Sequence, residues 1–186
     1  MSKLLFREPT PTDAAAIHRL VHRCRPLDPN SPYAYMLLAL HFRGTCVVAE
    51  QGQRVVGFLS AYVPPQQQDT IFVWQVAIDP EARGQGLAGR LLDELLARDV
   101  CAGVSFLETT VTPSNQPSRR LFGALARRLA APLDTSVLFP AELFDGAEPA
   151  GGEPSPAHEA EELLRIGPFS LSRMEVRSQS GGERSA

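Results

Sequence analysis

Cysteine, excess basic charge and long apolar runs are all scarce in this chain of 186 residues. The three cysteines, Cys24, Cys46 and Cys101, are odd in number and sit among apolar neighbours, so we expect free thiols in a reducing cytoplasm. Their spacing resembles no zinc site, and no metal is expected. The formal net charge of −3 argues against a nucleic-acid partner, which usually needs a net basic face. No segment has the apolar length of a membrane span or a secretory leader, so neither is expected.

The composition that remains is that of an ordinary globular protein. Hydrophobic residues make up 44% of the chain and charged residues 21%, and the length fits one domain with a sizeable core. We predict a single domain over residues 1–171. Residues 140–158 are rich in proline, glycine and acidic side chains and are expected to form a mobile loop, and residues 172–186 a disordered tail.

Hydrophobic periodicity divides the domain into strands and helices. Apolar residues recur at helical spacing between Ile17 and Cys24, and Ser31 followed by Pro32 is a typical helix start. Two more helices are predicted near residues 86–98 and 116–129, and strands at 4–8, 45–50, 54–63, 70–78, 104–112 and 135–139. Residues 159–169 are long enough for a helix, but a closing strand fits the order better. Hairpins come first and crossovers later, which predicts an α/β (α+β) fold with a mixed sheet of six to seven strands and about four helices.

Residues 84–89, GQGLAG, match the G-x-G-x-x-G pattern of dinucleotide-binding turns, but their context argues against a nicotinamide site. In that fold the first glycine follows its strand almost at once. Here residues 79–83 separate Gly84 from a strand that ends near Ile78. Free backbone N–H groups, the helix dipole and the forked charge of Arg83 still favour a phosphate. The alternative is a β–α turn that uses glycine for its geometry alone.

The same turn resembles the pyrophosphate loop of the GCN5-related N-acetyltransferase (GNAT) superfamily, which has the pattern Q/R-x-x-G-x-G/A. Arg83, Gly86 and Ala88 occupy its positions after a strand ending in AIDP, and residues 115–122 match the second cofactor segment, N-x-x-A/S-x-x-L-Y/F. The resemblance implies the GNAT fold, a mostly antiparallel sheet and acetyl-CoA as cosubstrate. In that family the strand before the loop splays from its neighbour, and its backbone pairs with the pantetheine arm. The implied cofactor contacts are Val76, Ala77, Ile78, Arg83, Gly84, Gln85, Gly86, Leu87, Ala88, Gly89, Asn115, Ser118 and Phe122.

A closer resemblance covers nearly all of the chain outside its tail. The strings DPNSPYAYMLL, TIFVWQVAIDPEARGQGLAGRLLDELL, TTVTPSNQPSRRLF and EAEELLRIGP are similar to those of the diaminobutyrate acetyltransferases of ectoine synthesis. That family acetylates the γ-amine of L-2,4-diaminobutyrate, and another enzyme cyclises the N4-acetyl product to the osmolyte ectoine. The resemblance implies this reaction here, and a homodimer.

A substrate with two amines and one carboxylate needs acidic groups near its ammonium groups and donors near its carboxylate. The resemblance implies Asp28, Tyr33, Trp74 and Glu159 as substrate contacts, and we add Thr70 from its place on the same strand as Trp74. Each residue has a plainer interpretation: a turn residue for Asp28, core packing for the aromatic residues, and a solvated charge for Glu159.

Two-residue alternation along the strand at 70–78 predicts that Thr70, Phe72, Trp74 and Val76 share one face, unless a bulge intervenes. Trp74 would then wall the substrate pocket with Thr70 nearby.

The expected reaction is direct attack of a neutral amine on the thioester, because no Cys, Ser or His has a recognisable nucleophile setting. Glu159 and Asp28 are the candidate bases, acting directly or through water. Backbone N–H groups near residues 76–78 could polarise the thioester carbonyl. Phe122 stands where the superfamily often has a tyrosine that protonates the leaving thiolate, so another group serves or the thiolate leaves unaided.

Two other functions stay open. One is acetylation of another small diamine or amino acid, and the other is non-catalytic sensing of an acyl-CoA. The presence of both cofactor segments together with the acidic residues argues against a sensor.

Overall fold

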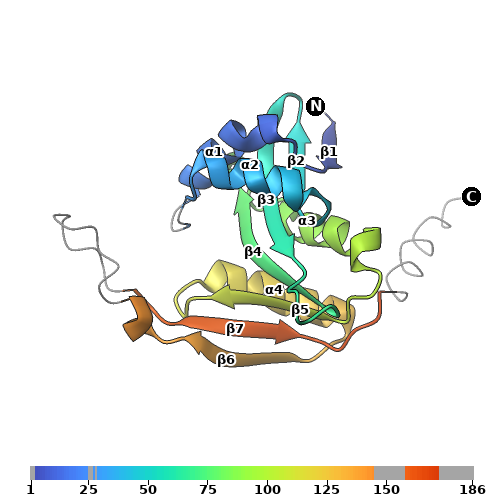
Figure 1. Cartoon of the computed structure of the whole chain (residues 1–186), viewed down its shortest axis with the longest axis vertical. Helices are drawn as coiled ribbons and strands as arrows, with labels where there is room; N and C mark the ends of the chain where they lie inside the picture. Colours follow the sequence, from blue (N-terminus) through green and yellow to red (C-terminus); the bar gives the residue numbers. More distant parts are fainter. Residues whose placement is uncertain (1–2, 25–26, 28, 145–157, 172–186) are drawn as a thin grey trace, which may run out of the picture.

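The computed structural model describes residues 3–24, 27, 29–144 and 158–171 (Figure 1). Its strands form one seven-stranded sheet in the order β1-β2-β3-β4-β5-β7-β6, in which β4 and β5 are parallel and the other neighbours antiparallel. Residues 159–169 provide the predicted strand and not a helix, because β7 pairs with both β5 and β6. The strands are β1 Leu4–Arg7, β2 Val47–Gln51, β3 Arg54–Tyr62, β4 Thr70–Ile78, β5 Phe106–Val111, β6 Leu133–Phe139 and β7 Glu161–Ile166.

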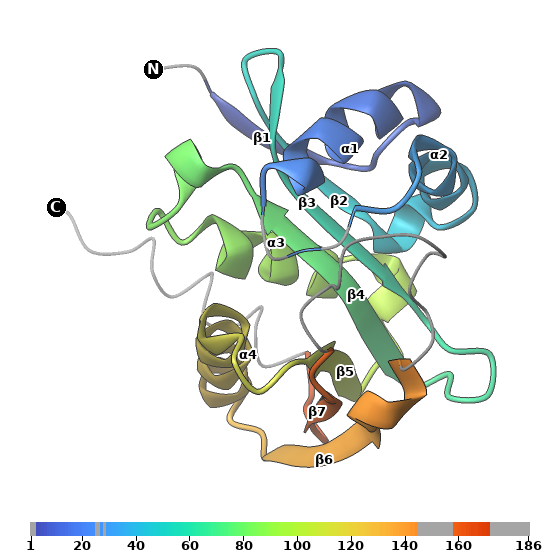
Figure 2. The same cartoon turned by 90° about the vertical axis from the view of Figure 1, so that its left-hand side faces the viewer.

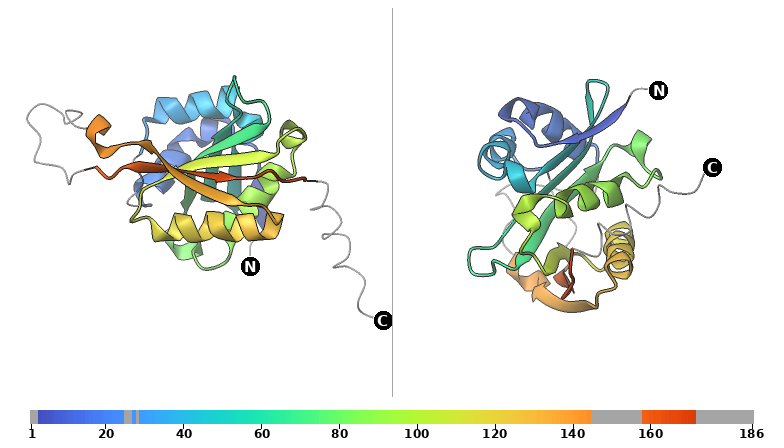
Figure 3. Two further views of the ribbon diagram at one scale, coloured as in Figure 1. Left: turned by 90° about the horizontal axis from the view of Figure 1, so that it is seen from below. Right: turned by 90° about the vertical axis from the view of Figure 1, so that its right-hand side faces the viewer.

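The helices cover both faces of this sheet (Figures 2 and 3). They are α1 Ala14–His22, α2 Pro32–His41, α3 Leu87–Leu96 and α4 Gln116–Leu129, so the predicted number of strands and helices is confirmed within the described residues. The predicted start of α2 is also confirmed, because the Ser31 side chain accepts a hydrogen bond from the N–H of Ala34.

Two apolar clusters hold the layers together. One lies between the sheet and helices α3 and α4, and includes Leu91, Leu95 and Leu125. The other lies between the sheet and helices α1 and α2, and includes Ile17 and Phe58. Helices α1, α3 and α4 each bury one apolar stripe, whereas α2 is apolar on most of its surface and leaves Met36 and Leu40 exposed.

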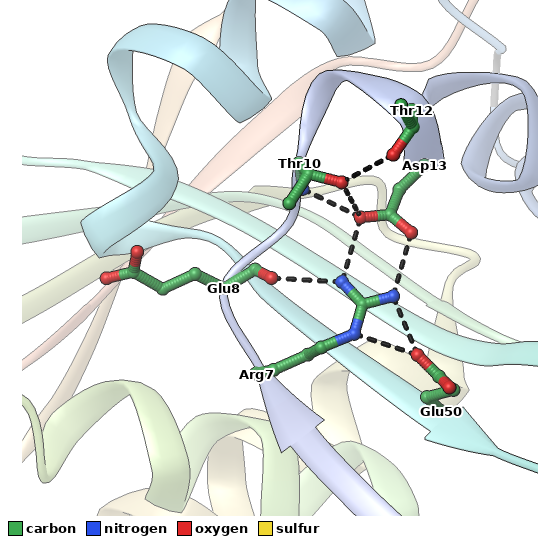
Figure 4. Close-up of polar contacts among 6 residues, drawn as sticks. All are labelled: Arg7, Glu8, Thr10, Thr12, Asp13 and Glu50. Carbon is green, nitrogen blue, oxygen red and sulfur yellow. Dashed lines mark hydrogen bonds and ion pairs between the residues drawn. The ribbon is translucent and has the colours of Figure 1, made fainter.

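A polar cluster joins β1 to the start of α1 and to β2 (Figure 4). The Arg7 guanidinium donates to both carboxylate oxygens of Asp13 at 2.8 Å, and its Nε donates to Glu50 at 2.8 Å. The N–H and hydroxyl of Thr10 donate to the same carboxylate at 2.7 and 2.9 Å. The hydrogen bonds from Arg7 outweigh the effect of burial and lower the pKa of Asp13 to about 2.

The two segments expected to be mobile lie largely outside the described residues. Ala141–Phe144 form a short 3₁₀ helix at the start of the predicted loop, whereas residues 145–157 and the tail at 172–186 are not described. None of the described helices combines the length and the apolarity needed to cross a lipid bilayer.

Ionised Asp13 should stabilise the fold in a pH-dependent way. Its folded pKa of about 2 lies below the unfolded value of about 3.9, so its contribution is complete above pH 5 and is lost as the pH falls through 2. We expect Asp13→Asn to lower the free energy of unfolding by about 2 kcal/mol at pH 7 and by about half of that at pH 3. Urea unfolding at both pH values measures this, and equal losses would contradict the assignment.

Candidate active site

The centre of the sheet opens where β4 and β5 separate (Figure 1). These strands pair only through residues 70–72 and 106–108, although β4 continues to Ile78 and β5 to Val111. After these paired residues, β4 remains hydrogen-bonded only to β3, and β5 only to β7. The structure thus has the splay that the resemblance implied.

Backbone alternation decides which groups of β4 face this opening. The N–H of Asp79 donates to the carbonyl of Val56 at 2.9 Å, in register with the antiparallel pairing of β3 and β4. The backbone groups of Val76 and Ile78 consequently point towards the opening, and those of Ala77 point towards β3. Ala77 is also completely buried in the cluster beneath α1 and α2, so its inclusion among the exposed backbone contacts is corrected.

A cavity of about 280 Å³ occupies the opening. Its lining includes six of the predicted cofactor residues, namely Val76, Ile78, Arg83, Ala88, Asn115 and Ser118. Sequence reasoning missed four others: Cys24, Leu27, Pro117 and Leu121. Pro117 and Leu121 lie within the matched α4 segment and could have been included, whereas Cys24 and Leu27 follow α1 and carry no motif.

The glycine loop places the N-terminus of α3 at the rim of this cavity. Gly84 and Gly86 have φ angles of +77° and +71°, and a Cβ at either would meet nothing within 4 Å. These glycines are therefore required by backbone conformation and not by space. The first N–H groups of α3 have no partners within the helix, which makes this end suitable for an anion. The Nε of Arg83 lies 3.4 Å from the carbonyl of Ile78, on the same side.

The other loop residues differ in what they contact. Leu87 is buried in the core cluster, and a Cβ on Gly89 would lie 3.4 Å from a guanidinium nitrogen of Arg128. The side-chain amide of Gln85 donates to the carbonyl of Glu81 at 3.5 Å. These three residues shape the loop, and Arg83 and Ala88 are the loop residues that line the cavity.

Asp79 anchors the loop to the end of α1. This carboxylate is 3% exposed, accepts from the N–H of Glu81 at 3.1 Å and pairs with Arg23 at 2.8 Å. Burial alone would raise the pKa of Asp79, but the bonds from Glu81 and Arg23 and the charge of Arg54 outweigh it and lower the pKa. An ionised, nearly buried carboxylate thus joins the segments on two sides of the cavity.

The predicted residues of the α4 segment fall on two sides of the helix. Asn115 and Ser118 line the cavity, and the Asn115 side chain also caps α4 by accepting from the N–H of Ser118 at 3.2 Å. Phe122 does not line the cavity: it is 3% exposed and packs in the core. One residue corresponds to about 100° around a helix, so Leu121 faces the cavity when Phe122 faces the core.

A β-bulge interrupts β4 beside the opening. Ser60 of β3 pairs with Gln75, but the next β3 residue, Ala61, pairs with Val73. Trp74 is therefore the extra residue on β4, and its side chain is 48% exposed.

The bulge overturns the expectation that Trp74 and Val76 share a face. Ile71 and Val73 pack in the cluster beneath α3 and α4, and Val76 and Ile78 pack against that same cluster. The side-chain period therefore shifts by one residue at the bulge.

The predicted substrate residues occupy different settings. Tyr33, in the first turn of α2, is 67% exposed, whereas Thr70 is completely buried and donates to Asp69 at 3.1 Å. Exposed Glu159 accepts from the N–H of Ser114 at 3.1 Å and also from its hydroxyl, which holds the carboxylate beside the cavity residue Asn115. Asp28 lies outside the described residues.

The described cysteines are all buried free thiols. Burial raises the pKa of Cys24, and it raises the pKa of Cys46 and of Cys101 to about 11. A thiol in such a setting is a poor nucleophile at neutral pH. Within the described ranges no group of three or more His, Cys, Asp or Glu side chains is placed to hold a metal ion.

A splayed sheet with a glycine loop beneath its opening defines the class of this protein. The chain belongs to the acetyltransferase (GNAT) family, whose model matches residues 14–126. More distant solved structures agree in fold: the ribosomal-protein-S18-alanine N-acetyltransferase of Escherichia coli, at 17% identity, gives a TM-score of 0.63 and covers 99% of both chains.

Closer relatives share one name. The L-2,4-diaminobutyric acid acetyltransferase of Halalkalibacterium halodurans is 46% identical over 87% of this chain and 80% of its own length. The enzyme of the same name from Halomonas elongata is 48% identical over 90% of this chain and 83% of its own length. The diaminobutyrate acetyltransferase of Paenibacillus lautus, solved with its substrate L-2,4-diaminobutyric acid and coenzyme A, is 40% identical with a TM-score of 0.84, covering 91% of this chain and 97% of that one.

Proposed function

We propose that this protein transfers an acetyl group from acetyl-CoA to the γ-amine of L-2,4-diaminobutyrate and so supplies N4-acetyl-L-2,4-diaminobutyrate for ectoine synthesis. The observation that carries the proposal is similarity along most of the chain to proteins of this activity, one of them solved with this amine and coenzyme A. The two sides of the β4–β5 opening then receive the two substrates.

The cofactor side is formed by the cavity and the glycine loop. The positive end of α3 and the charge of Arg83 suit the pyrophosphate, and the backbone groups of Val76 and Ile78 suit the amide groups of the pantetheine arm. The carbonyl of Ile78 already accepts a hydrogen bond from the Cys24 thiol at 3.2 Å. The backbone groups of Val76 are therefore the better candidates for bonds to the pantetheine arm. The N–H groups facing the opening are also placed to stabilise negative charge on the thioester oxygen.

The amine side is formed by Tyr33, Trp74 and Glu159, with Asp28 as a further acidic contact. An alkyl ammonium has a pKa of about 10.4, so the site must remove a proton before the amine attacks. Glu159 is held by Ser114 next to the cavity residue Asn115, and we assign it the role of proton acceptor, directly or through water. Buried Thr70 is not part of this assignment.

The attack forms an N–C bond and breaks the C–S bond, which releases coenzyme A. Phe122 is buried and has no proton to donate, so the thiolate leaves unaided or takes a proton from water. With a thiol pKa of about 8.5, departure as thiolate is feasible at neutral pH.

The same proposal includes a cytoplasmic homodimer. Three buried free thiols suit a reducing compartment. Two surfaces offer apolar area for a second copy. One is α2, where Met36 and Leu40 are exposed, and the other is the edge strand β6, whose seven residues are all exposed and include Val137 and Phe139.

The direct test of the reaction is release of thiol. With acetyl-CoA present, adding L-2,4-diaminobutyrate should start release of free coenzyme A, and NMR of the product should place the acetyl group on the γ-nitrogen. Faster release with ornithine, lysine or 1,3-diaminopropane would instead indicate another small amine. Tight binding of acetyl-CoA with no release for any amine would indicate a sensor.

Arg83 tests the phosphate side separately. Arg83→Glu places negative charge beside the proposed pyrophosphate site and should raise the KM for acetyl-CoA at least about tenfold, the equivalent of one charge-assisted hydrogen bond. The KM for the amine should change little. Arg43→Glu is the matched control, because it makes the same charge change at an exposed arginine that does not line the cavity. An unchanged KM for acetyl-CoA in Arg83→Glu would refute the phosphate role.

The dimer is tested by light scattering. The wild-type protein should have twice the mass of the 20.2 kDa chain. Of the variants Leu40→Lys and Val137→Lys, one should be monomeric and identify the surface used, while the other serves as its control. A wild-type mass of one chain, or two variants that both remain dimeric, would contradict this part of the proposal.

A further inference from the structure

A buried hydrogen bond connects the bulge of β4 to helix α2. The hydroxyl of Tyr35 donates to the side-chain carbonyl oxygen of Gln75 at 3.1 Å. Tyr35 is completely buried and Gln75 is 8% exposed, so this polar contact lies beneath the helix layer. Gln75 directly follows the bulged residue, Trp74, and it is the bulge that turns Gln75 towards α2.

The same hydroxyl also holds the chain segment that leads into α2. The N–H of Asn30 donates to the Tyr35 oxygen at 3.2 Å. Burial raises the pKa of Tyr35, so its hydroxyl stays protonated and can accept from Asn30 while it donates to Gln75. The ring is held edge-on against Phe58, with centroids 5.8 Å apart. One phenol oxygen therefore joins the bulge to the start of α2.

Core packing alone does not require these polar groups. Phenylalanine at position 35 and leucine at position 75 would bury similar apolar volume without the cost of desolvating a hydroxyl and an amide, and among the bonds described above only the one from Asn30 would be left without its acceptor. A buried polar pair that an apolar pair could replace often serves geometry more than stability.

The positions joined by this bond carry the two aromatic residues proposed for the amine side. Trp74 is the neighbour of Gln75 and Tyr33 precedes Tyr35 by two residues, and both side chains are exposed. We propose that Tyr35 and Gln75 are positioning residues for the amine substrate, because their hydrogen bond sets the β4 bulge, and with it Trp74, relative to the start of α2. This inference rests on the proposed function for the identity of the amine.

The test combines two single variants with their double variant. Tyr35→Phe and Gln75→Leu should each raise the KM for L-2,4-diaminobutyrate about fivefold, which corresponds to the loss of one hydrogen bond, and leave the KM for acetyl-CoA within about twofold. Each single variant breaks the buried hydrogen bond between the two side chains and should lower the unfolding midpoint. The double variant removes both side-chain groups of that bond and should regain part of the stability, although the N–H of Asn30 still lacks its acceptor, and its KM for the amine should stay high.

Asp13→Asn is the control for a purely structural loss. Asp13 belongs to the polar cluster around Arg7 and takes no part in the hydrogen bonds of Tyr35, so this variant should lose stability without a change in either KM. The inference is overturned if the amine KM of the double variant returns to the wild-type value along with stability. It is also overturned if both KM values rise together in the single variants.

Fluorescence makes the test independent of which amine is used. Trp74 is the one tryptophan of the chain, so its emission and its quenching by acrylamide report on the bulge directly. Both single variants and the double variant should change the quenching of Trp74 in the free protein, and Asp13→Asn should not. If the wild-type enzyme does not acetylate diaminobutyrate, the proposed function is wrong. The KM comparison is then made with whichever amine the enzyme acetylates. Unchanged quenching in all three variants would refute the link itself.

Discussion

The limited pairing of β4 with β5 is the constraint on which the rest of this molecule depends. Three residues of each strand are paired, and after that each strand keeps only its outer neighbour. Buried parallel strands normally stay paired along their length because unpaired backbone groups are costly. Here the unpaired backbone groups lie at the centre of the sheet. The cavity at this place is lined by residues of β4, of the loop before α3 and of the start of α4.

The two sides of the opening are supported in different ways. On the side proposed for the cofactor, conformation comes from glycines with positive φ and from ionised Asp79, which joins the loop to the end of α1. On the side proposed for the amine it comes from a bulge and from neutral hydrogen bonds around Tyr35. The first kind of support depends on an ionised group and the second on neutral groups, and they hold the two sides that we propose for acetyl-CoA and for the amine.

Much of this could be predicted from the sequence, because local patterns determine it. Helical spacing, the Ser31 cap and the glycine turn are recognised from a few neighbouring residues, and four residues of the matched motifs line the cavity: Arg83, Ala88, Asn115 and Ser118. The failures are positions decided by pairing or packing at long range. Simple alternation predicts that Val76 and Trp74 share a face, but the bulge in the β3–β4 pairing separates them. The same register directs the backbone groups of Ala77 towards β3. Phe122 is buried in the core, and no local motif indicates that burial. Cys24 and Leu27 reach the cavity only because α1 packs over β4.

The sheet also divides the chain into two consecutive parts. Strands β1 to β4 with α1 to α3 come first, and β5, α4, β6 and β7 follow. The short paired stretch of β4 and β5 and the shared cluster beneath α3 and α4 are what join them. This line has the shortest pairing in the sheet, with three residues on each strand, so backbone hydrogen bonds contribute less here than side-chain packing does. The spacing of the two parts, and with it the width of the opening, is therefore set mainly by the side chains of that shared cluster.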